Sequence, residues 1–362
     1  MNADPVSILE ELVRFRTDRV HGDERKLAEH LGAELRRRGA EDISLVETPR
    51  VEGKPVSYVY ARFGNPKLIV NAHLDTVPPN SDWHTDPFVP KVDGDRLYAL
   101  GACDTKGAAA AILAALSEAK PKDIGILFSG DEEYSSVAMR AFLAGPHATG
   151  IDRAIVCEPT NLRAGTRHRG FVAFEVRTSG PGGHSSLADH TPAPLAKLAR
   201  LAVAFTEWGE RHVPLGPKGF EGMCLNIAKV DGGIAFNVIP AEGVLTVSFR
   251  PPPGTDVTAV YAELEAITRS VIPDATHTWI RQMIPFATRD AAAFRPLLGD
   301  AAIDGAIDLG FWTEAALLAG QGIDAVVYGV GDIAHAHAPN EWVPIPELHA
   351  AKERFRAIFE AV

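Results

Sequence analysis

Residues 68–75 read LIVNAHLD, an apolar run that ends in a histidine and an aspartate two positions apart. An apolar run without polar alternation is typical of a parallel β-strand that helices cover on both faces. His73 and Asp75 would then follow the carboxyl end of this strand, where open α/β sheets bind their ligands. The imidazole could bind a metal ion there and the carboxylate could orient it, although a plain surface loop explains the same two residues.

The segments around this run alternate between helix-like and strand-like patterns. Leucines recur every four residues over 23–38, and an alanine-rich helix is expected from about residue 105 to 119. Short apolar strands are expected at 56–63, 97–100, 124–128, 154–157 and 325–328, and further helices at 135–143 and 346–360. This alternation predicts an α/β domain with a mostly parallel sheet and helices on both faces.

The pattern changes near residue 170. Strands that each expose one face are expected at 224–230, 244–250 and 276–283, with helices at 194–208 and 256–271. This mixture predicts a smaller α+β domain inserted into the larger one. We therefore expect the larger domain to consist of two parts, 1–169 and 284–362, and the inserted domain to span 170–283.

The composition narrows the kind of protein. The chain has 362 residues, 36 of them basic and 47 acidic, so its formal net charge is −11. This length favours two domains, and the acidic excess argues against a nucleic-acid partner. The three cysteines lie far apart and imply a reducing compartment, while the longest apolar run, 108–116, is too short to cross a bilayer. Since the N-terminus also lacks the pattern of a signal peptide, we expect a cytoplasmic protein without a membrane partner.

Carboxylates follow other predicted strands. Asp104 lies at the expected start of the alanine-rich helix, where helix capping explains it as well as ligand binding does. The acids of residues 131–133 follow the strand at 124–128; one could bind a metal and its neighbour could move a proton, or the segment could be a solvated turn. Glu158 directly follows the strand at 154–157.

Two histidines, His335 and His337, lie in the loop after the strand at 325–328, and their spacing alone does not decide which could be a ligand. With His73 and the carboxylates they complete a mixed set of nitrogen and oxygen donors that suits zinc. If one carboxylate bridges, five such ligands are enough for a hydrolase with paired metal ions.

These motifs together resemble the M20 family of metallopeptidases and amidohydrolases, over almost the whole chain. The matching segments, in order, are HLDTVP (73–78), GACDTKG (101–107), DEE (131–133), EPT (158–160), GGHSS (182–186) and AHAPNE (336–341). The acetylornithine and acetylcitrulline deacetylase branch is the most similar, judged by Cys103, NIAKVDGGIAFNVIP (226–240), FWTEA (311–315) and YGVGDIAHAH (328–337).

The resemblance implies a centre of two divalent metal ions, expected to be zinc with cobalt able to replace it. His73, Asp104 and Glu158 would hold one ion. Asp104, Glu133 and His337 would hold the other, so that Asp104 bridges the two. His337 is the implied ligand because the family's histidine comes just before the acidic segment that ends the last motif.

The resemblance also assigns the proton chemistry. Asp75 would orient His73, and Glu132 would be the general base that takes a proton from water and delivers it to the leaving amine. His184 in the inserted domain would stabilise the oxyanion, reaching the site of the neighbouring subunit. The inserted domain would therefore be a lid that forms a homodimer. His335 differs from the polar residue usual at its position, and its role stays open.

Substrate contacts are expected from three further residues. Arg250 could bind the substrate α-carboxylate as a fork and Asn237 could add an amide contact, although both could simply belong to turns. Glu314 would face the substrate side chain. The implied reaction removes the acetyl group of N2-acetylornithine or N-acetylcitrulline in arginine biosynthesis. Alternatives are succinyl-diaminopimelate desuccinylase or dipeptidase activity on the same scaffold, or a metal-binding protein without catalysis.

Overall fold

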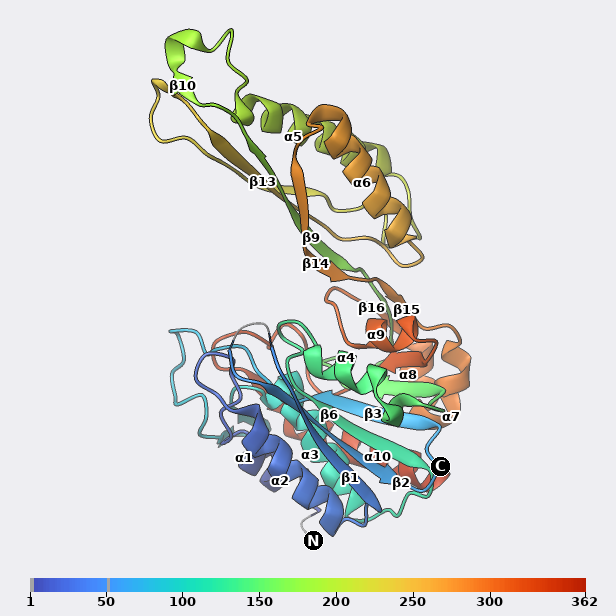
Figure 1. Ribbon diagram of the computed structural model, residues 1–362. Helices are drawn as coiled ribbons and strands as arrows, with labels where there is room; N and C mark the ends of the chain where they lie inside the picture. The colour runs from blue at the N-terminus through green and yellow to red at the C-terminus, as the bar shows by residue number, and fades with distance from the viewer. Residues whose placement is uncertain (1–2, 51–52) are drawn as a thin grey trace. The chain divides into compact units, whose positions relative to one another are not determined.

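The computed structural model describes residues 3–50 and 53–362. They form two compact units (Figure 1). The first comprises Met1–Thr166, Thr288–Asp308 and Thr313–Val362, and the second comprises Arg167–Ala287 and Leu309–Trp312. The second unit contains all of the segment 170–283 that the sequence sets apart, with a few flanking residues.

A mixed β-sheet is the centre of the first unit. Its strand order is β1-β2-β6-β3-β7-β17-β8-β15, with β16 paired to β8. The four central strands, β6, β3, β7 and β17, run parallel. The bounds are β1 Asp42–Thr48, β2 Val56–Phe63, β3 Leu68–His73, β6 Ile124–Ser129, β7 Arg153–Val156, β8 Gly165–His168, β15 Phe286–Ala287, β16 Ile307–Leu309 and β17 Asp324–Val327. The predicted α/β class with a mostly parallel sheet is confirmed.

Helices cover both faces of this sheet, which explains why its inner strands lack polar alternation. In strand β2, Val59 and Ala61 join the core formed with leucines of α1, α2, α3 and α10. Tyr58 and Tyr60 of the same strand point to the opposite face, where they contact Phe142 of α4. The bounds are α1 Pro5–Leu12, α2 Glu24–Arg37, α3 Gly107–Leu116, α4 Val137–Ala144, α7 Arg295–Leu298, α8 Asp300–Asp304, α9 Ala315–Gly320 and α10 Ile345–Ala361.

Helix α3 is the most deeply buried helix of this unit. All ten of its residues are buried, and its sequence, GAAAAILAAL, consists mainly of alanines. It packs against α1 and α10. Small side chains allow this close approach on several sides, so the alanine-rich run is a packing requirement of the fold rather than a membrane segment. The residues before it, Ala102–Lys106, form a tight bend in which Asp104 has an extended backbone, with φ −124° and ψ 89°.

A three-stranded sheet, β18-β5-β4, lies within the same unit. It pairs β4 Lys91–Asp93 and β5 Arg96–Tyr98 with β18 Trp342–Pro344, so it joins segments that are far apart in the chain. This pairing brings the loop after β17 close to the loop that precedes α3.

The second unit is an antiparallel sheet with two helices (Figure 1). Its strand order is β11-β13-β9-β14, and a separate pair joins β10 to β12. Strand β13 alternates buried and half-buried residues because its buried side packs with Trp208 of α5 and Leu264 of α6. The bounds are β9 Phe171–Ser179, β10 Gly183–His184, α5 Pro194–His212, β11 Asn226–Asp231, β12 Val238–Ile239, β13 Glu242–Phe249, α6 Val257–Val271 and β14 Thr276–Met283.

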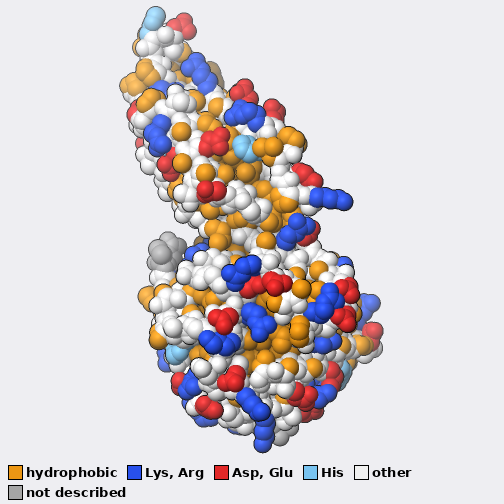
Figure 2. All heavy atoms as spheres, turned by 90° about the vertical axis from the view of Figure 1, so that its right-hand side faces the viewer, with side chains coloured by type: hydrophobic (Ala, Val, Ile, Leu, Met, Phe, Trp, Pro, Cys, Tyr) orange, Lys and Arg blue, Asp and Glu red, His pale blue; other side chains and the backbone are white. Residues whose placement is uncertain are grey.

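The surface mixes charges of both signs. On the face drawn in Figure 2, the Lys and Arg side chains are interspersed with Asp and Glu rather than gathered into one basic patch. Among the described residues, no helix combines the length and the apolar character that a membrane crossing needs.

Candidate metal centre

The site residues of the first unit stand at one edge of the parallel sheet. His73 ends β3 and pairs in register with Ser129, which ends β6. Asn71 pairs with Val156, which ends β7. Since parallel strands end at the same edge, the segments that follow β6 and β7, 131–133 and Glu158, emerge beside His73.

Asp104 is the centre of this cluster because it contacts both candidate histidine ligands. Its Oδ1 lies 2.8 Å from Nε2 of His73, and its Oδ2 lies 3.4 Å from Nε2 of His337. The same His337 nitrogen lies 2.8 Å from Oε1 of Glu133. One carboxylate thus offers an oxygen to each histidine, which is the arrangement that a bridging ligand needs.

The donor atoms are close enough to share metal ions. One ligand atom from each of His73, Asp104 and Glu133 lies within 4.8 Å of the others, and the same holds for His73, Glu132 and Glu158. Imidazole nitrogens and carboxylate oxygens are the ligands that zinc takes in catalytic sites. The structure therefore brings one set of candidate ligands together, with His337 joined to the two groups through its contacts with Glu133 and Asp104.

The charges of the cluster also fit a cation. Burial, followed by repulsion from Asp104, raises the pKa of both Glu133 and Glu158. Burial and the nearby Glu158 likewise raise the pKa of Glu132. Crowded carboxylates of this kind are stabilised in their charged form by a divalent cation placed among them.

Asp75 contacts both the His73 ring and the loop that carries Glu132 and Glu133. Its backbone carbonyl lies 2.9 Å from Nδ1 of His73, whereas its carboxylate is 3.6 Å away. A proton on Nδ1 leaves the Nε2 lone pair free for a metal. The carboxylate instead accepts hydrogen bonds from the backbone N–H groups of Glu132 and Glu133, both at 3.1 Å. Asp75 thereby fixes the loop that carries the candidate base.

Glu314 lies near the cluster, next to Ser129 at the end of β6. Its side chain is only 1% exposed and accepts a hydrogen bond of 2.6 Å from Oγ of Ser129. Burial raises its pKa to about 7. Its other oxygen, Oε1, has no hydrogen-bond partner among the described residues. Its expected contact with a substrate side chain stays a prediction.

Comparison with known proteins decides the family. Residues 69–361 match the model of Peptidase family M20/M25/M40. The chain belongs to this family. It is 36% identical to an N-acetyl-L-citrulline deacetylase of Xanthomonas campestris pv. campestris, over 83% of each chain. It is 31% identical to an acetylornithine deacetylase of Myxococcus xanthus, over 79% of this chain and 77% of that one.

A solved structure of the family has the same fold. A dinuclear metal-binding peptidase of the M20 family from Bacillus subtilis superposes with a TM-score of 0.70 at 15% identity, covering 99% of this chain and 97% of that chain. The predicted M20 resemblance is therefore confirmed, and the protein is a hydrolase of a metal-dependent family.

Three residues that the M20 resemblance assigns to the site belong to the second unit. Nδ1 of His184 lies 2.9 Å from Oγ of Ser186 and 3.2 Å from the backbone nitrogen of the same residue, so these contacts fix the orientation of the ring. Asn237 lies beside it, since its carbonyl accepts from the Ser185 N–H at 3.1 Å. The Arg250 guanidinium lies 4.8 Å from the ring centre of Phe171. Their roles in this M20 protein stay predictions.

His335, whose role the sequence leaves open, packs against an aromatic ring. Its imidazole lies 4.2 Å from Trp342, measured between ring centres. The Arg96 guanidinium lies 4.1 Å from the centre of the same indole ring. His335 therefore contributes to packing at the small three-stranded sheet, while His337 contacts the other candidate ligands.

Sequence reasoning missed the residues that support the ligand loops. The side chain of Arg50 is only 7% exposed and contacts both Glu24 and Asp131 at 2.7 Å, which ties the start of the 131–133 loop to helix α2. Glu341 is buried as well and accepts hydrogen bonds from the loop of Asp104. No local signal distinguishes these charged residues from solvated ones, because their partners lie far away in the sequence.

Proposed function

We propose that this M20 protein is an amidohydrolase with two metal ions that removes the acetyl group from the α-nitrogen of N2-acetylornithine or N-acetylcitrulline. The observation that carries the proposal is Asp104, whose two oxygens contact His73 and His337 at the edge of the sheet. The names of the two deacetylase relatives support the substrate class. The reaction would supply a free amino acid to arginine biosynthesis.

The proposed ligand set is the one that the family resemblance implies, and the contacts of Asp104 and His337 support it. His73, Asp104 and Glu158 would hold one ion, and Asp104, Glu133 and His337 would hold the other. When bound, the two divalent cations, which we take to be zinc with cobalt as a substitute, would lower the pKa of a water molecule and polarise the acyl oxygen.

Glu132 is the proposed general base. Its carboxylate oxygen would accept a proton from the attacking water and deliver it to the nitrogen of the leaving amine. An oxygen of Glu132 lies within 4.8 Å of ligand atoms of His73 and Glu158, which supports a role beside the metal centre. The hydrogen bond from its N–H to Asp75 keeps its backbone in place throughout.

Residues of the inserted unit would complete the site. His184 would donate a hydrogen bond from Nε2 to the oxyanion, while its Nδ1 contacts Ser186. Arg250 would bind the substrate α-carboxylate with its planar fork, and Asn237 would add an amide contact. Glu314, in the first unit, would face the substrate side chain.

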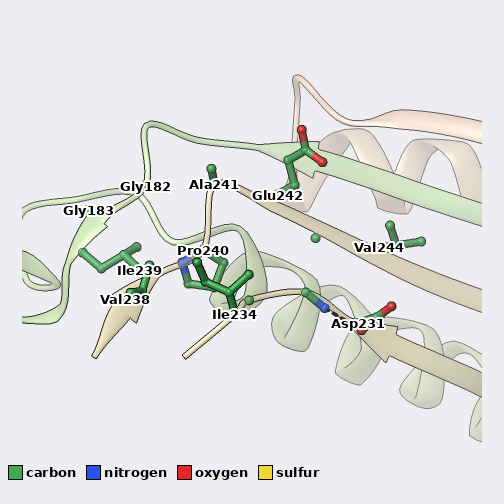
Figure 3. A pocket seen from close by; sticks show the side chains of 13 residues that line it. Gly182, Gly183, Asp231, Ile234, Val238, Ile239, Pro240, Ala241, Glu242 and Val244 are labelled. Carbon is green, nitrogen blue, oxygen red and sulfur yellow. Dashed lines mark hydrogen bonds between the residues drawn. The ribbon is translucent and has the colours of Figure 1, made fainter. Parts of the chain in front are cut away.

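We further propose that the inserted unit forms a homodimer. Strand β11 is an edge of the sheet, and an open edge is available for pairing with another copy. The loop after β11 carries two apolar residues that are exposed to solvent: Ile234 is 89% exposed and Phe236 is fully exposed. A hollow of about 550 Å³ includes residues of this loop in its lining, and Ile234, Val238 and Pro240 lie close together among its lining residues (Figure 3).

The proposed setting is the cytoplasm. Cys103, Cys157 and Cys224 are all free thiols, which suits a reducing compartment. The expected partner is a small N-acyl amino acid; we expect neither a nucleic acid nor a membrane to bind.

A substrate panel tests the proposal. Purified protein is stripped of metal, reloaded with zinc or cobalt, and assayed on N2-acetylornithine, N-acetylcitrulline, N-succinyl-diaminopimelate and dipeptides. We expect the acetylated α-amino acids to give the highest kcat/KM and the metal-free protein to be inactive. Preferred cleavage of dipeptides or of the succinyl substrate would move the protein to another activity of the family, and no hydrolysis of any amide would contradict an enzymatic role.

A further inference from the structure

The carboxylate of Glu341 lies inside the loop that carries Asp104. Its Oε2 accepts a hydrogen bond from the backbone N–H of Gly101 at 3.0 Å. Its Oε1 accepts two more, from the N–H groups of Cys103 at 2.8 Å and Asp104 at 3.0 Å. The side chain is buried, with the residue only 2% exposed. Converging backbone N–H groups form a concave site for an anion, and here a side chain of the protein fills it.

The loop conformation is built for this contact. Gly101 has a φ of 79°, in the left-handed region that favours glycine. A Cβ atom at this position would come within 2.7 Å of the Thr76 methyl group. The backbone carbonyl of Glu341 also accepts from the Ala99 N–H at 3.1 Å, so the residue binds both ends of the loop.

Glu341 also connects this loop to that of His337. It follows His337 by four residues and directly precedes β18, which pairs with β5 just before the Asp104 loop. Asp104 and His337 contact each other across these two segments, at 3.4 Å between Oδ2 and Nε2. The position of one candidate ligand relative to the other therefore depends on how Glu341 holds the loop.

We propose that Glu341 is a positioning residue of the metal centre. It would fix the backbone of Asp104, so that both carboxylate oxygens point to their ions before any metal arrives. The inference rests on the proposed function for the identity of the ligands. It assigns Glu341 a role in metal affinity, although Glu341 is not one of the proposed ligands. Outer partners of metal ligands commonly change metal affinity or activity by about 10–100-fold.

A purely structural role is the competing explanation, and the chain offers a matched control for it. Asp324 begins β17, at the end of the strand away from the loop that carries His337 and Glu341. It is also buried and accepts two backbone hydrogen bonds, from Arg289 at 2.8 Å and Asp290 at 3.1 Å. Loss of either carboxylate would remove comparable backbone contacts, but only Glu341 lies next to a candidate ligand.

The test compares Glu341→Gln with Asp324→Asn. Zinc affinity is measured on the folded, metal-free proteins by calorimetry, and the visible absorption bands of Co²⁺ report the coordination geometry. We expect both variants to melt at lower temperature without metal. Only Glu341→Gln should lose zinc affinity, by about 10–100-fold, and change the Co²⁺ spectrum. With a substrate that the wild type cleaves, kcat should fall while KM stays unchanged.

Several outcomes would overturn the inference. Zinc affinity of Glu341→Gln within about twofold of the wild type is one, and an equal loss of affinity in Asp324→Asn is another. If Glu341→Gln does not fold, Glu341→Asp is measured instead, since it keeps the charge but shortens the reach, and the same criterion applies. Because these readouts need no substrate, failure of the proposed deacetylase activity leaves them interpretable; a wild type that binds no zinc would instead contradict the proposed function.

Discussion

Glu132 and Glu133 are adjacent, yet the structure gives them different surroundings. Asp75 accepts a hydrogen bond from the backbone N–H of each at the same distance. The Glu133 carboxylate contacts His337, whereas a Glu132 oxygen lies among His73 and Glu158. Neighbouring residues project in different directions, so one carboxylate can bind metal while the next moves a proton. A substitution of Glu132 should therefore affect proton transfer alone, whereas a substitution of Glu133 should affect metal binding.

We predict that Glu132→Gln keeps both metal ions and loses about 10²–10⁴-fold in kcat, because it removes a base and not a ligand. Metal content is measured by mass spectrometry and kcat in the same preparation. Glu133→Gln is the matched control and should lose metal as well as activity. Wild-type turnover in a metal-loaded Glu132→Gln protein would refute the assignment of the base.

Asp104 is the residue on which both ions should depend. We predict that Asp104→Ala binds neither ion tightly, since the bridging carboxylate serves both positions, whereas the exposed Asp82→Ala keeps about two per chain. Metal per chain after dialysis is the measurement. A count near two in Asp104→Ala would mean that the bridge lies elsewhere in the cluster.

At the scale of elements, helix α3 shows how small side chains determine packing. Its alanines face neighbours on every side, and the helix lies between α1 and α10. Protein interiors are close-packed, so a larger side chain here has no space without displacement of a neighbouring helix. A larger side chain on the exposed side of α10 would extend into solvent and displace no neighbour.

We predict that Ala111→Leu destabilises the first unit by about 1–3 kcal/mol through overpacking, whereas Ala350→Leu, on the exposed side of α10, changes stability by about 0.5 kcal/mol or less. Urea unfolding monitored by circular dichroism measures both variants. Equal urea midpoints for the two variants would contradict the close packing around α3.

The elements predicted from sequence succeed where hydrophobic periodicity is strong. The alternation in THTWIRQM places β14 at Thr276–Met283, the predicted bounds. Strand β1 was not predicted, because its residues are only partly buried and give no core signal. Strand β11 begins at Asn226 instead of the expected residue 224, since Cys224 has a φ of 48°, which no strand residue adopts.

At the scale of the whole molecule, the fold could be predicted from the sequence more completely than the residues that hold the ligand loops in place. The candidate ligands could be named because they follow predicted strands or, like Asp104, precede a predicted helix, and because each lies in a family motif. Asp75, Arg50 and Glu341 contact backbone groups and charges in other loops. These contacts depend on the tertiary structure, so no local sequence pattern predicts them. Glu314 could be named from its motif, but its burial near the cluster could not.

The proposed homodimer leads to a prediction about its surface. We predict that Phe236→Asp gives a monomer with reduced activity, because a charge replaces a fully exposed aromatic side chain next to the edge strand and His184 would no longer reach a neighbouring site. Sedimentation velocity measures the mass. The control is Val92→Asp, a change at a half-exposed position of the first unit, which should stay dimeric. An active wild-type monomer would remove His184 from the mechanism.

The scattered origin of the ligands has a consequence for biosynthesis. A nascent chain that has emerged as far as Thr166 already contains His73, Asp104, Glu133 and Glu158, but it lacks His337 and strand β17, which lies between β7 and β8 in the finished sheet. Glu341, which holds the Asp104 loop, emerges later still. Tight metal capture should therefore be among the last events of maturation, and bound metal would mark a chain whose two distant segments have come together.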